Sequence, residues 1–213
     1  KEWQRYTLAL NTANKKRTKR YGDKAVNCRL VVAGKKDATV ALDMISLFPH
    51  DTYKGHGLRK DLAEAIAELK PKFVRFPGGC MSHGQGIDNI YHWNHTIGPL
   101  QDRKPDKNIW NYHQTRGLGF YEYFQMCEDM GAEPLPVLAA GVPCQNSRAN
   151  AEGYGGQQGG IPMSEMPAYC QEILDMIEWA NGDPATSKWA KMRADAGHPA
   201  PFNLKYVGVG NED

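Results

Sequence analysis

The sequence predicts a parallel α/β fold, and a region of antiparallel β-structure precedes it. After Pro49, stretches with apolar residues at helical spacing alternate with short apolar runs, which is typical of helices that connect parallel strands. Before Pro49, apolar residues recur at every second position, which is typical of half-buried antiparallel strands. We therefore divide the chain into residues 1–50 and residues 51–213.

The N-terminal region contains three runs of alternating apolar residues. They are Tyr6, Leu8 and Leu10; then Val26, Cys28, Leu30 and Val32; then Val40, Leu42 and Met44. A Gly-Lys-Lys-Asp turn at residues 34–37 separates the last two runs. The basic cluster at residues 15–20 is interpreted as a solvated loop, because it lacks the interleaved aromatic residues of a nucleic-acid-binding segment.

Helices and strands then alternate three times. The first helix spans about Leu58–Lys70, and Pro71 ends it before the apolar strand 73–76. The second helix ends at Gly131 and precedes the strand 134–138, whereas the third begins at a Ser164 cap. A short helix with Trp189 and Met192 follows, and then the strand 204–209. The expected apolar faces are Leu62, Ile66 and Leu69; then Phe120, Tyr123, Phe124, Cys127 and Met130; then Cys170, Ile173, Leu174 and Ile177.

Strands as apolar as these are expected to be buried on both faces, as in a parallel sheet. A closed (β/α)8 barrel needs about 250 residues, whereas Leu58–Asp213 supplies 156 residues and three strands. The first residues, Lys1–Gln4, include neither Met nor the apolar core of a signal peptide. We therefore expect an internal fragment of a longer protein.

Composition excludes several classes of protein. The 26 Lys and Arg residues nearly balance the 24 Asp and Glu residues, and 41% hydrophobic content is enough for an ordinary core, which excludes wholesale disorder. No run approaches the roughly 18 apolar residues of a membrane helix. Five cysteines without CxxC spacing indicate neither a disulfide framework nor a zinc knuckle.

Candidate catalytic groups follow the predicted strands, because parallel α/β folds collect such groups at the carboxyl ends of their strands. The first strand leads through Arg75 into a Pro-Gly-Gly turn at residues 77–79, where backbone can approach a ligand, and a buried Arg there would need an anion. The third strand ends at Asn211, Glu212 and Asp213. A carboxylate there could transfer a proton, and the amide could hold a hydroxyl group. The small residues 139–144 after the second strand are expected to form a wall.

Two alternative interpretations of these segments, a dinucleotide-binding loop and a zinc site, stay open. Gly208 and Gly210 match the start of a dinucleotide-binding loop, whose third glycine would lie after the last residue. Cys80, His92 and His95 could bind zinc, although their spacing is weak and a fourth ligand is not evident.

The long segment 81–115 between the first strand and the second helix is rich in aromatic residues and histidines. Loops of this length are usually functional or disordered, and aromatic residues argue against disorder. Planar side chains suit the C–H faces of sugar rings, which favours carbohydrate binding. The aromatic residues are Tyr91, Trp93, Trp110 and Tyr112, and the histidines are His83, His92, His95 and His113.

Five motifs in this order resemble the α-L-arabinofuranosidases of glycoside hydrolase family 51. They are FVRFPGGC at 73–80, YHW at 91–93, IGP at 97–99, GFYEYF at 119–124 and GVGNE at 208–212. The segments SLFP at 46–49 and DTY at 51–53 are similar to the subgroup with an inserted β-sandwich module that resembles carbohydrate-binding modules. The resemblance implies that residues 1–50 are the C-terminal part of that β-sandwich and that residues 51–213 are the N-terminal half of the (β/α)8 TIM barrel.

The resemblance also implies a reaction: retaining exo-hydrolysis of terminal non-reducing α-L-arabinofuranosyl residues from arabinoxylan or arabinan. Glu212 would be the general acid/base, and Asn211 would bind the 2-hydroxyl of the sugar. Arg75 would steady the catalytic carboxylates, and Cys80 and Trp93 would contact substrate. The catalytic nucleophile, a glutamate, would lie beyond Asp213, so this fragment alone would be inactive. The Met-Ser-His sequence at 81–83 stands where this subgroup has an acidic residue.

The expected partner is an arabinose-containing oligosaccharide or polysaccharide, with no nucleic acid, no membrane, no metal and no organic cofactor. The resemblance leaves a homo-oligomer open and favours a secreted or periplasmic location. Two alternatives stay open: a non-catalytic carbohydrate-binding or remnant fragment, and another retaining glycosidase of the same barrel clan.

Overall fold

The computed structural model describes residues 2–10, 30–34, 37, 39–144 and 160–212, and the chain divides into two compact units, Lys1–Asp43 and Met44–Asp213. In the first unit the described residues form neither helix nor strand, and they are exposed, Tyr6 at 85% and Leu30 at 66%. The expectation of half-buried strands is therefore wrong for these residues, while Val26 and Cys28 lie outside the described ones. An alternating pattern forms a strand only where a partner strand and a second layer cover it. The β-sandwich assignment of residues 1–50 stays a prediction.

The second unit contains the predicted parallel sheet. Its strands are β1 (Phe73–Phe76), β4 (Glu133–Leu138) and β5 (Gly208–Val209), in the order β1-β4-β5. Both pairs are parallel. The last strand is shorter than predicted, and at Leu204 the backbone bonds the side chain of Asn181 in place of a neighbouring strand. Its Oδ1 accepts from the backbone N of Leu204 at 2.7 Å, and its Nδ2 donates to the backbone O of Leu204 at 2.9 Å.

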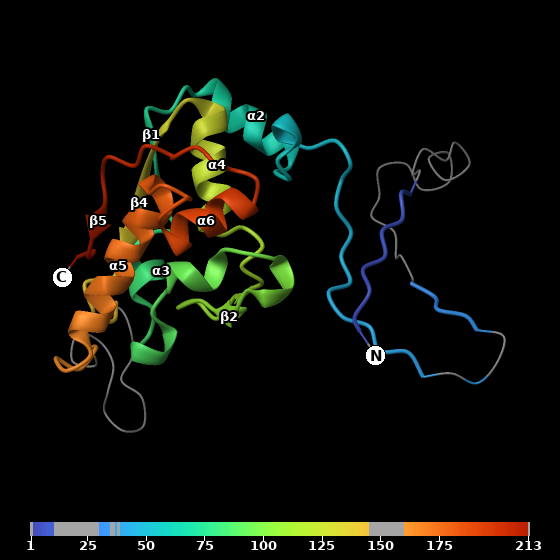
Figure 1. Ribbon diagram of the computed structural model, residues 1–213, viewed down its shortest axis with the longest axis horizontal. Coiled ribbons are helices and arrows are strands. Elements are labelled where there is room, and N and C mark those ends of the chain that lie inside the picture. The colour runs from blue at the N-terminus through green and yellow to red at the C-terminus, as the bar shows by residue number, and fades with distance from the viewer. Residues whose placement is uncertain (1, 11–29, 35–36, 38, 145–159, 213) are drawn as a thin grey trace. The chain divides into compact units, whose positions relative to one another are not determined.

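Five α-helices accompany these strands in the described part of the second unit (Figure 1). They are α2 (Lys60–Glu68), α3 (Gly79–His83), α4 (Phe120–Met130), α5 (Met166–Asn181) and α6 (Lys188–Asp195). The described part of the second unit also contains four short 3-10 helices and one antiparallel strand pair. The 3-10 helices are η1 (Tyr53–Gly55), η2 (Ile87–Asn89), η3 (Trp93–Thr96) and η4 (Leu100–Asp102), and the pair is β2 (Asp106–Lys107) and β3 (His113–Gln114). As predicted, Gly131 ends α4 in the left-handed conformation, with φ of 68°.

The core is an aromatic cluster between β1, α4 and α5. The Phe76 ring meets the Phe120 ring edge to face at 5.5 Å, and Phe124 meets Trp179 at 5.3 Å. Burial therefore alternates along β1, since Phe76 is 1% exposed while Phe73, on the opposite face, is 58% exposed. The expectation of strands buried on both faces is wrong for β1. A closed barrel fills its interior with side chains from all its strands, and three strands do not close one.

Two predicted apolar helix faces are also corrected. In α2 only Ala63 is buried, and the predicted face of Leu62, Ile66 and Leu69 is exposed. In α5 apolar residues occur all round the helix, so periodicity does not single out one face. The predicted Cys170, Leu174 and Ile177 are exposed; the buried residues are Tyr169, Met176, Trp179 and Ala180. Nor does Ser164 cap α5, because the N-cap residue is Glu165.

Arg193 of α6 is fully buried, and its guanidinium donates to four backbone carbonyl groups. Nε reaches His198 O at 3.0 Å, and Nη1 reaches Trp179 O at 2.6 Å. Nη2 reaches Gly182 O and Pro199 O, each at 3.0 Å. Trp179 and Gly182 lie at the end of α5, so this side chain joins α5, α6 and the segment after α6. A cation also suits the negative end of the α5 dipole.

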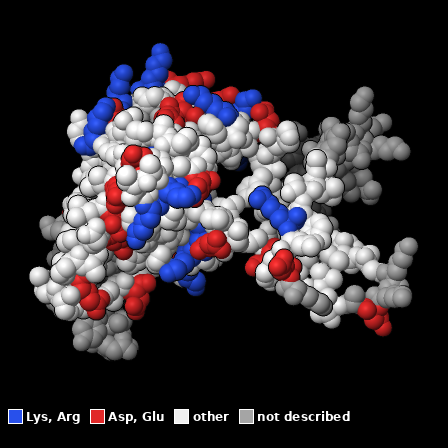
Figure 2. All heavy atoms as spheres, viewed as in Figure 1, with Lys and Arg blue, Asp and Glu red and all other residues white. Residues whose placement is uncertain are grey.

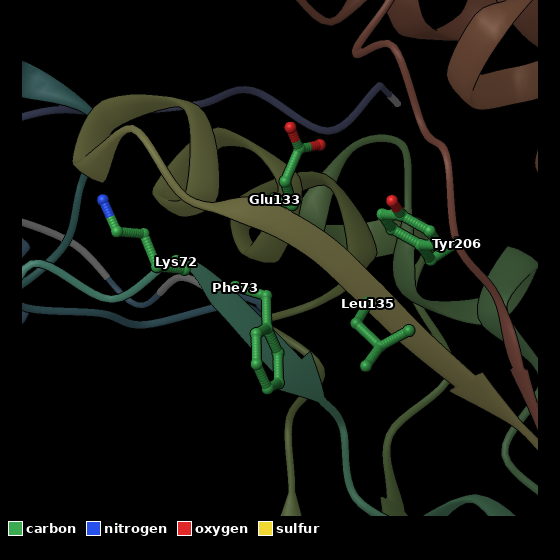
Figure 3. A pocket seen from close by; sticks show the side chains of 5 residues that line it. All are labelled: Lys72, Phe73, Glu133, Leu135 and Tyr206. Carbon is green, nitrogen blue, oxygen red and sulfur yellow. The ribbon is translucent and has the colours of Figure 1, made fainter.

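The open face of the sheet carries a hollow of about 260 Å³ at the amino-terminal ends of the strands. Figure 3 shows its lining, which comes from β1, β4 and the segment before β5: Lys72, Phe73, Glu133, Leu135 and Tyr206. This hollow lies at the end of the sheet opposite to the one where parallel α/β folds place their chemistry.

The surface of the second unit carries charges of both signs. Figure 2 shows Lys and Arg side chains interspersed with Asp and Glu side chains over the face in view. Within the described residues, no helix combines the length and the apolar character needed to cross a bilayer.

Candidate active site

Three of the sequence-predicted residues meet at the carboxyl end of the sheet. Arg75 of β1 donates from Nη2 to Oδ1 of Asn211 at 2.7 Å, and Nδ2 of Asn211 donates to Oε2 of Glu212 at 3.3 Å. The residues lie in one row, from guanidinium to amide to carboxylate. The expected buried Arg with an anionic partner is therefore corrected: Arg75 is exposed and donates to an amide oxygen.

The short strand β5 brings Asn211 and Glu212 to this edge. Gly208 and Val209 pair with the last two residues of β4, and Gly210 N extends the ladder by donating to Leu138 O at 2.8 Å. The chain then leaves the sheet with Asn211 directly at the strand end. Arg75 and Asn211, 136 positions apart in sequence, become neighbours only through β4.

The arrangement orients the amide of Asn211. Because the Arg75 guanidinium only donates, the Asn211 oxygen faces it and the NH2 group faces the Glu212 carboxylate. Glu212 is exposed and has a φ of 58°, a backbone conformation that residues with a Cβ seldom adopt and that recurs at functional sites. An exposed carboxylate beside an oriented amide can exchange a proton with a bound hydroxyl or ether oxygen. Asp213, the third candidate here, lies outside the described residues.

Helix α3 packs against this group from the turn after β1. Ser82 is fully buried, and its Oγ lies 2.7 Å from Gly78 O and 2.8 Å from Val137 O, which ties the turn to β4. Cys80 is half-buried in this helix, next to Gly79, whose backbone lies against Asn211. Sequence reasoning missed Ser82, because nothing in its local pattern sets it apart from a surface serine.

Trp93 does not belong to this group. It is fully buried in the aromatic core, its ring lies 5.1 Å from that of Trp189, and its Nε1 donates to Glu172 O at 2.8 Å. A ring enclosed in this way offers no face to a sugar, so the assignment of Trp93 as a substrate-contacting residue is corrected. His83 belongs to the segment 81–83, where the resemblance led us to expect an acidic residue. It is also buried, with Nδ1 2.6 Å from Val142 O.

The exposed aromatic side chains of the long segment lie instead on the β2–β3 hairpin. Trp110 is 57% exposed and Tyr112 is 69% exposed. Gln85, just after α3, donates from Nε2 to Ile109 O at 2.9 Å, and Gln114 Nε2 lies 3.7 Å from the sulfur of Met81 in α3. The hairpin is thus anchored to the helix that follows β1, at the carboxyl end of that strand.

The small residues 139–144 pack as expected of a wall. Ala139 and Cys144 are fully buried. Tyr169 of α5 donates from its hydroxyl to Ala139 O at 2.9 Å, and Cys144 N donates to Gly84 O at 3.0 Å. This segment therefore connects α5 to the chain after α3.

The histidines of the long segment make contacts with other protein groups. His92 Nδ1 lies 2.8 Å from Oε2 of Glu172 in α5, and its ring lies 4.9 Å from that of His95. Among the residues that the structure describes, no three His, Cys, Asp or Glu side chains are grouped so as to hold a metal ion. The zinc alternative on Cys80, His92 and His95 gains no support from this geometry.

We expect His95 to make stability depend on pH. Burial, with Lys104 and His92 nearby, lowers the pKa of His95 below its ordinary 6.5, while Glu172 opposes this. Between the lowered pKa and 6.5 the unfolded chain binds a proton that the folded chain does not, so stability falls as pH falls through this range. Replacing His95 with Asn should flatten the dependence of the melting temperature on pH there. An unchanged slope in His95→Asn would assign the dependence to other groups.

The second unit matches known proteins along most of its length. The family model described as "Alpha-L-arabinofuranosidase 1 domain" matches residues 65–213. An extracellular exo-α-L-arabinofuranosidase of Streptomyces chartreusis is 47% identical over 200 residues, which cover 87% of this chain and 22% of that protein. α-L-Arabinofuranosidase 1 of Arabidopsis thaliana is 41% identical over 188 residues, which cover 88% of this chain and 26% of that protein.

Solved structures agree with these relatives. The arabinose-bound MgGH51 α-L-arabinofuranosidase superposes with a TM-score of 0.65 at 40% identity, over 76% of this chain and 24% of that one. The arabinose complex of the Thermotoga maritima α-L-arabinofuranosidase superposes with a TM-score of 0.53 at 28% identity, over 74% of this chain and 26% of that one. The chain therefore spans about a quarter of the length of the proteins it matches.

Proposed function

The chain belongs to the α-L-arabinofuranosidases of glycoside hydrolase family 51, with part of their TIM barrel, and from this premise we propose that the whole protein releases terminal non-reducing α-L-arabinofuranosyl residues. Arabinose-containing plant polysaccharides such as arabinoxylan and arabinan are the proposed substrates. The row of Arg75, Asn211 and Glu212 at the carboxyl end of the sheet carries this proposal. Two of the matched structures are complexes with arabinose.

The proposed reaction retains the configuration of the sugar. A carboxylate attacks the anomeric carbon while Glu212 protonates the leaving oxygen, and Glu212 then accepts a proton from the water that releases arabinose. Retention requires two carboxyl groups about 5 Å apart. We place the second one, the nucleophile, on a later strand of the whole protein. Asn211, with its NH2 group oriented by Arg75, would donate to the 2-hydroxyl as well as to Glu212.

The experiment that tests this function compares aryl glycosides as substrates of the whole protein. We expect turnover of the aryl α-L-arabinofuranoside and at most trace turnover of the matching xyloside and glucoside. Proton NMR of the first product formed should show the anomer of the substrate. Turnover of the xyloside or glucoside instead would favour another retaining glycosidase, and arabinoside binding without turnover would favour a non-catalytic carbohydrate-binding protein.

Trp110 is proposed to contact the part of the polysaccharide beyond the arabinose. Its ring is exposed, and the hairpin that carries it is anchored to Gln85, just after α3. An aromatic contact of this kind contributes about 0.5–1.5 kcal/mol, so Trp110→Ala should raise KM for arabinoxylan by about twofold to tenfold. Trp110→Phe, which keeps a stacking face, is the matched control and should recover most of the loss. Equal KM values for Trp110→Ala and the unaltered protein would contradict this role.

A further inference from the structure

Gly79 lies so close to Asn211 that a Cβ at this position would collide with the Asn211 side chain where it now lies. A Cβ built on Gly79 would lie well inside the 3.0 Å that real Cβ atoms keep from Cγ, Oδ1 and Nδ2 of Asn211. The neighbouring Gly78 has a φ of 128°, which favours glycine for its backbone conformation. Gly79 is helical and buried, and its φ lies outside the positive range, so only the space at this position requires glycine.

The two sides of this contact differ in how firmly they are held. On the Gly79 side, the backbone N of the buried Ser82 donates to Gly78 O at 2.9 Å, and its Oγ lies 2.7 Å from Gly78 O and 2.8 Å from Val137 O of β4, either of which can accept its one proton. On the other side, the atoms that a Cβ would meet are the end of one side chain, just after the last residue of β5. An added methyl group at Gly79 would therefore move the Asn211 amide and leave α3 in place.

We propose that Gly79 is a positioning residue of the active site, and that its missing side chain makes the space in which the Asn211 amide lies between Arg75 and Glu212. This inference rests on the proposed function for its effect on turnover, but not for the displacement of Asn211. Once displaced, Asn211 loses the 2.7 Å bond from Arg75 that sets which end of its amide faces Glu212. Misplacement of a contacting group by about 1 Å can cost about 100-fold in rate.

The test is a double-mutant cycle in the whole protein. Gly79→Ala and Asn211→Ala should each lower kcat/KM for an aryl α-L-arabinofuranoside about 100-fold, and the double variant should be no slower than Asn211→Ala alone. Gly86→Ala is the matched control, because Gly86 has an extended backbone and a Cβ there would have no neighbour within 4 Å. We expect this control to keep its activity and all the variants to melt within a few degrees of one another.

A purely structural role for Gly79 gives a different result. If Gly79→Ala damaged the fold, it would lower activity by the same factor in the Asn211→Ala background, and that outcome would overturn the proposal. A crystal structure of Gly79→Ala supplies a readout that needs no activity. Asn211 away from Arg75 supports the proposal even if the protein hydrolyses no arabinofuranoside, and Asn211 in its present position refutes it.

Discussion

Replacing Glu212 with Gln in the whole protein should lower kcat on arabinoxylan by about 100-fold to 10,000-fold, the range that general acid–base catalysis supplies. The substitution keeps the shape of the side chain and a group beside Asn211 Nδ2, but it removes the proton that the leaving oxygen must receive. A sugar hydroxyl is a poor leaving group and needs this proton. The measurement is initial-rate hydrolysis of arabinoxylan against the unaltered protein.

The role of Glu212 can be separated from a loss of fold. An acidic phenol leaves an aryl arabinofuranoside without being protonated. Glu212→Gln should therefore still form the glycosyl-enzyme from such a substrate and should then stall at its hydrolysis. Added azide, a nucleophile that needs no general base, should restore turnover. Glu68→Gln, the same change at an exposed position of α2, is the control and should be silent. Arabinoxylan hydrolysis at an undiminished rate would remove Glu212 from the mechanism.

Replacing Arg193 with Met should destabilise the second unit by roughly 3–5 kcal/mol, because each buried carbonyl group that loses its donor costs about 1–3 kcal/mol and water can relieve those that are only partly buried. Four carbonyl oxygens lose their donor at once, at the end of α5 and after α6. Thermal unfolding of the whole protein measures the loss, and hydrogen exchange of the amides in α6 should show that it starts locally.

Two control variants show whether the loss of stability in Arg193→Met comes from its hydrogen bonds. Lys191→Met removes a cation from the same helix, but Lys191 is exposed and forms only an ion pair with Asp195 at 2.6 Å, so its cost should stay below about 0.5 kcal/mol. Arg193→Lys keeps the charge but presents its donors from a single nitrogen, so it should be intermediate. If Arg193→Met melted like Lys191→Met, water would be able to satisfy these carbonyl groups and the side chain would have no special role.

Local patterns predicted much of the barrel part of the fold. Helix α4 with its glycine end and strand β1 follow from local sequence patterns, and the structure confirms them together with the predicted parallel pairing of the strands. The same kind of reasoning located Arg75, Asn211 and Glu212, because carboxyl ends of parallel strands share one edge of a sheet. These three residues lie together because β4 pairs with both β1 and β5.

Contacts between distant segments could not be predicted in this way. Trp93 resembles a sugar-stacking residue in sequence, yet Trp179 and Trp189 enclose it. Periodicity alone misplaced the buried face of α5, since it does not say which of two apolar sides carries the larger rings. The need for a glycine at position 79 comes from its contact with Asn211, which the local Pro-Gly-Gly sequence does not reveal.

The order of the strands in the sheet affects when the site forms during folding. Because β4 lies between β1 and β5, Arg75 can meet Asn211 only after a loop of more than a hundred residues has closed. Because pairings between segments far apart in sequence form slowly, we expect the row of Arg75, Asn211 and Glu212 to form late in folding. In the part of the chain that the structure describes, two residue pairs and the bond from Gly210 N hold β5 to β4. Loss of this pairing would separate Asn211 from Arg75 while the aromatic core stays intact, so a local opening of the sheet is enough to break the row.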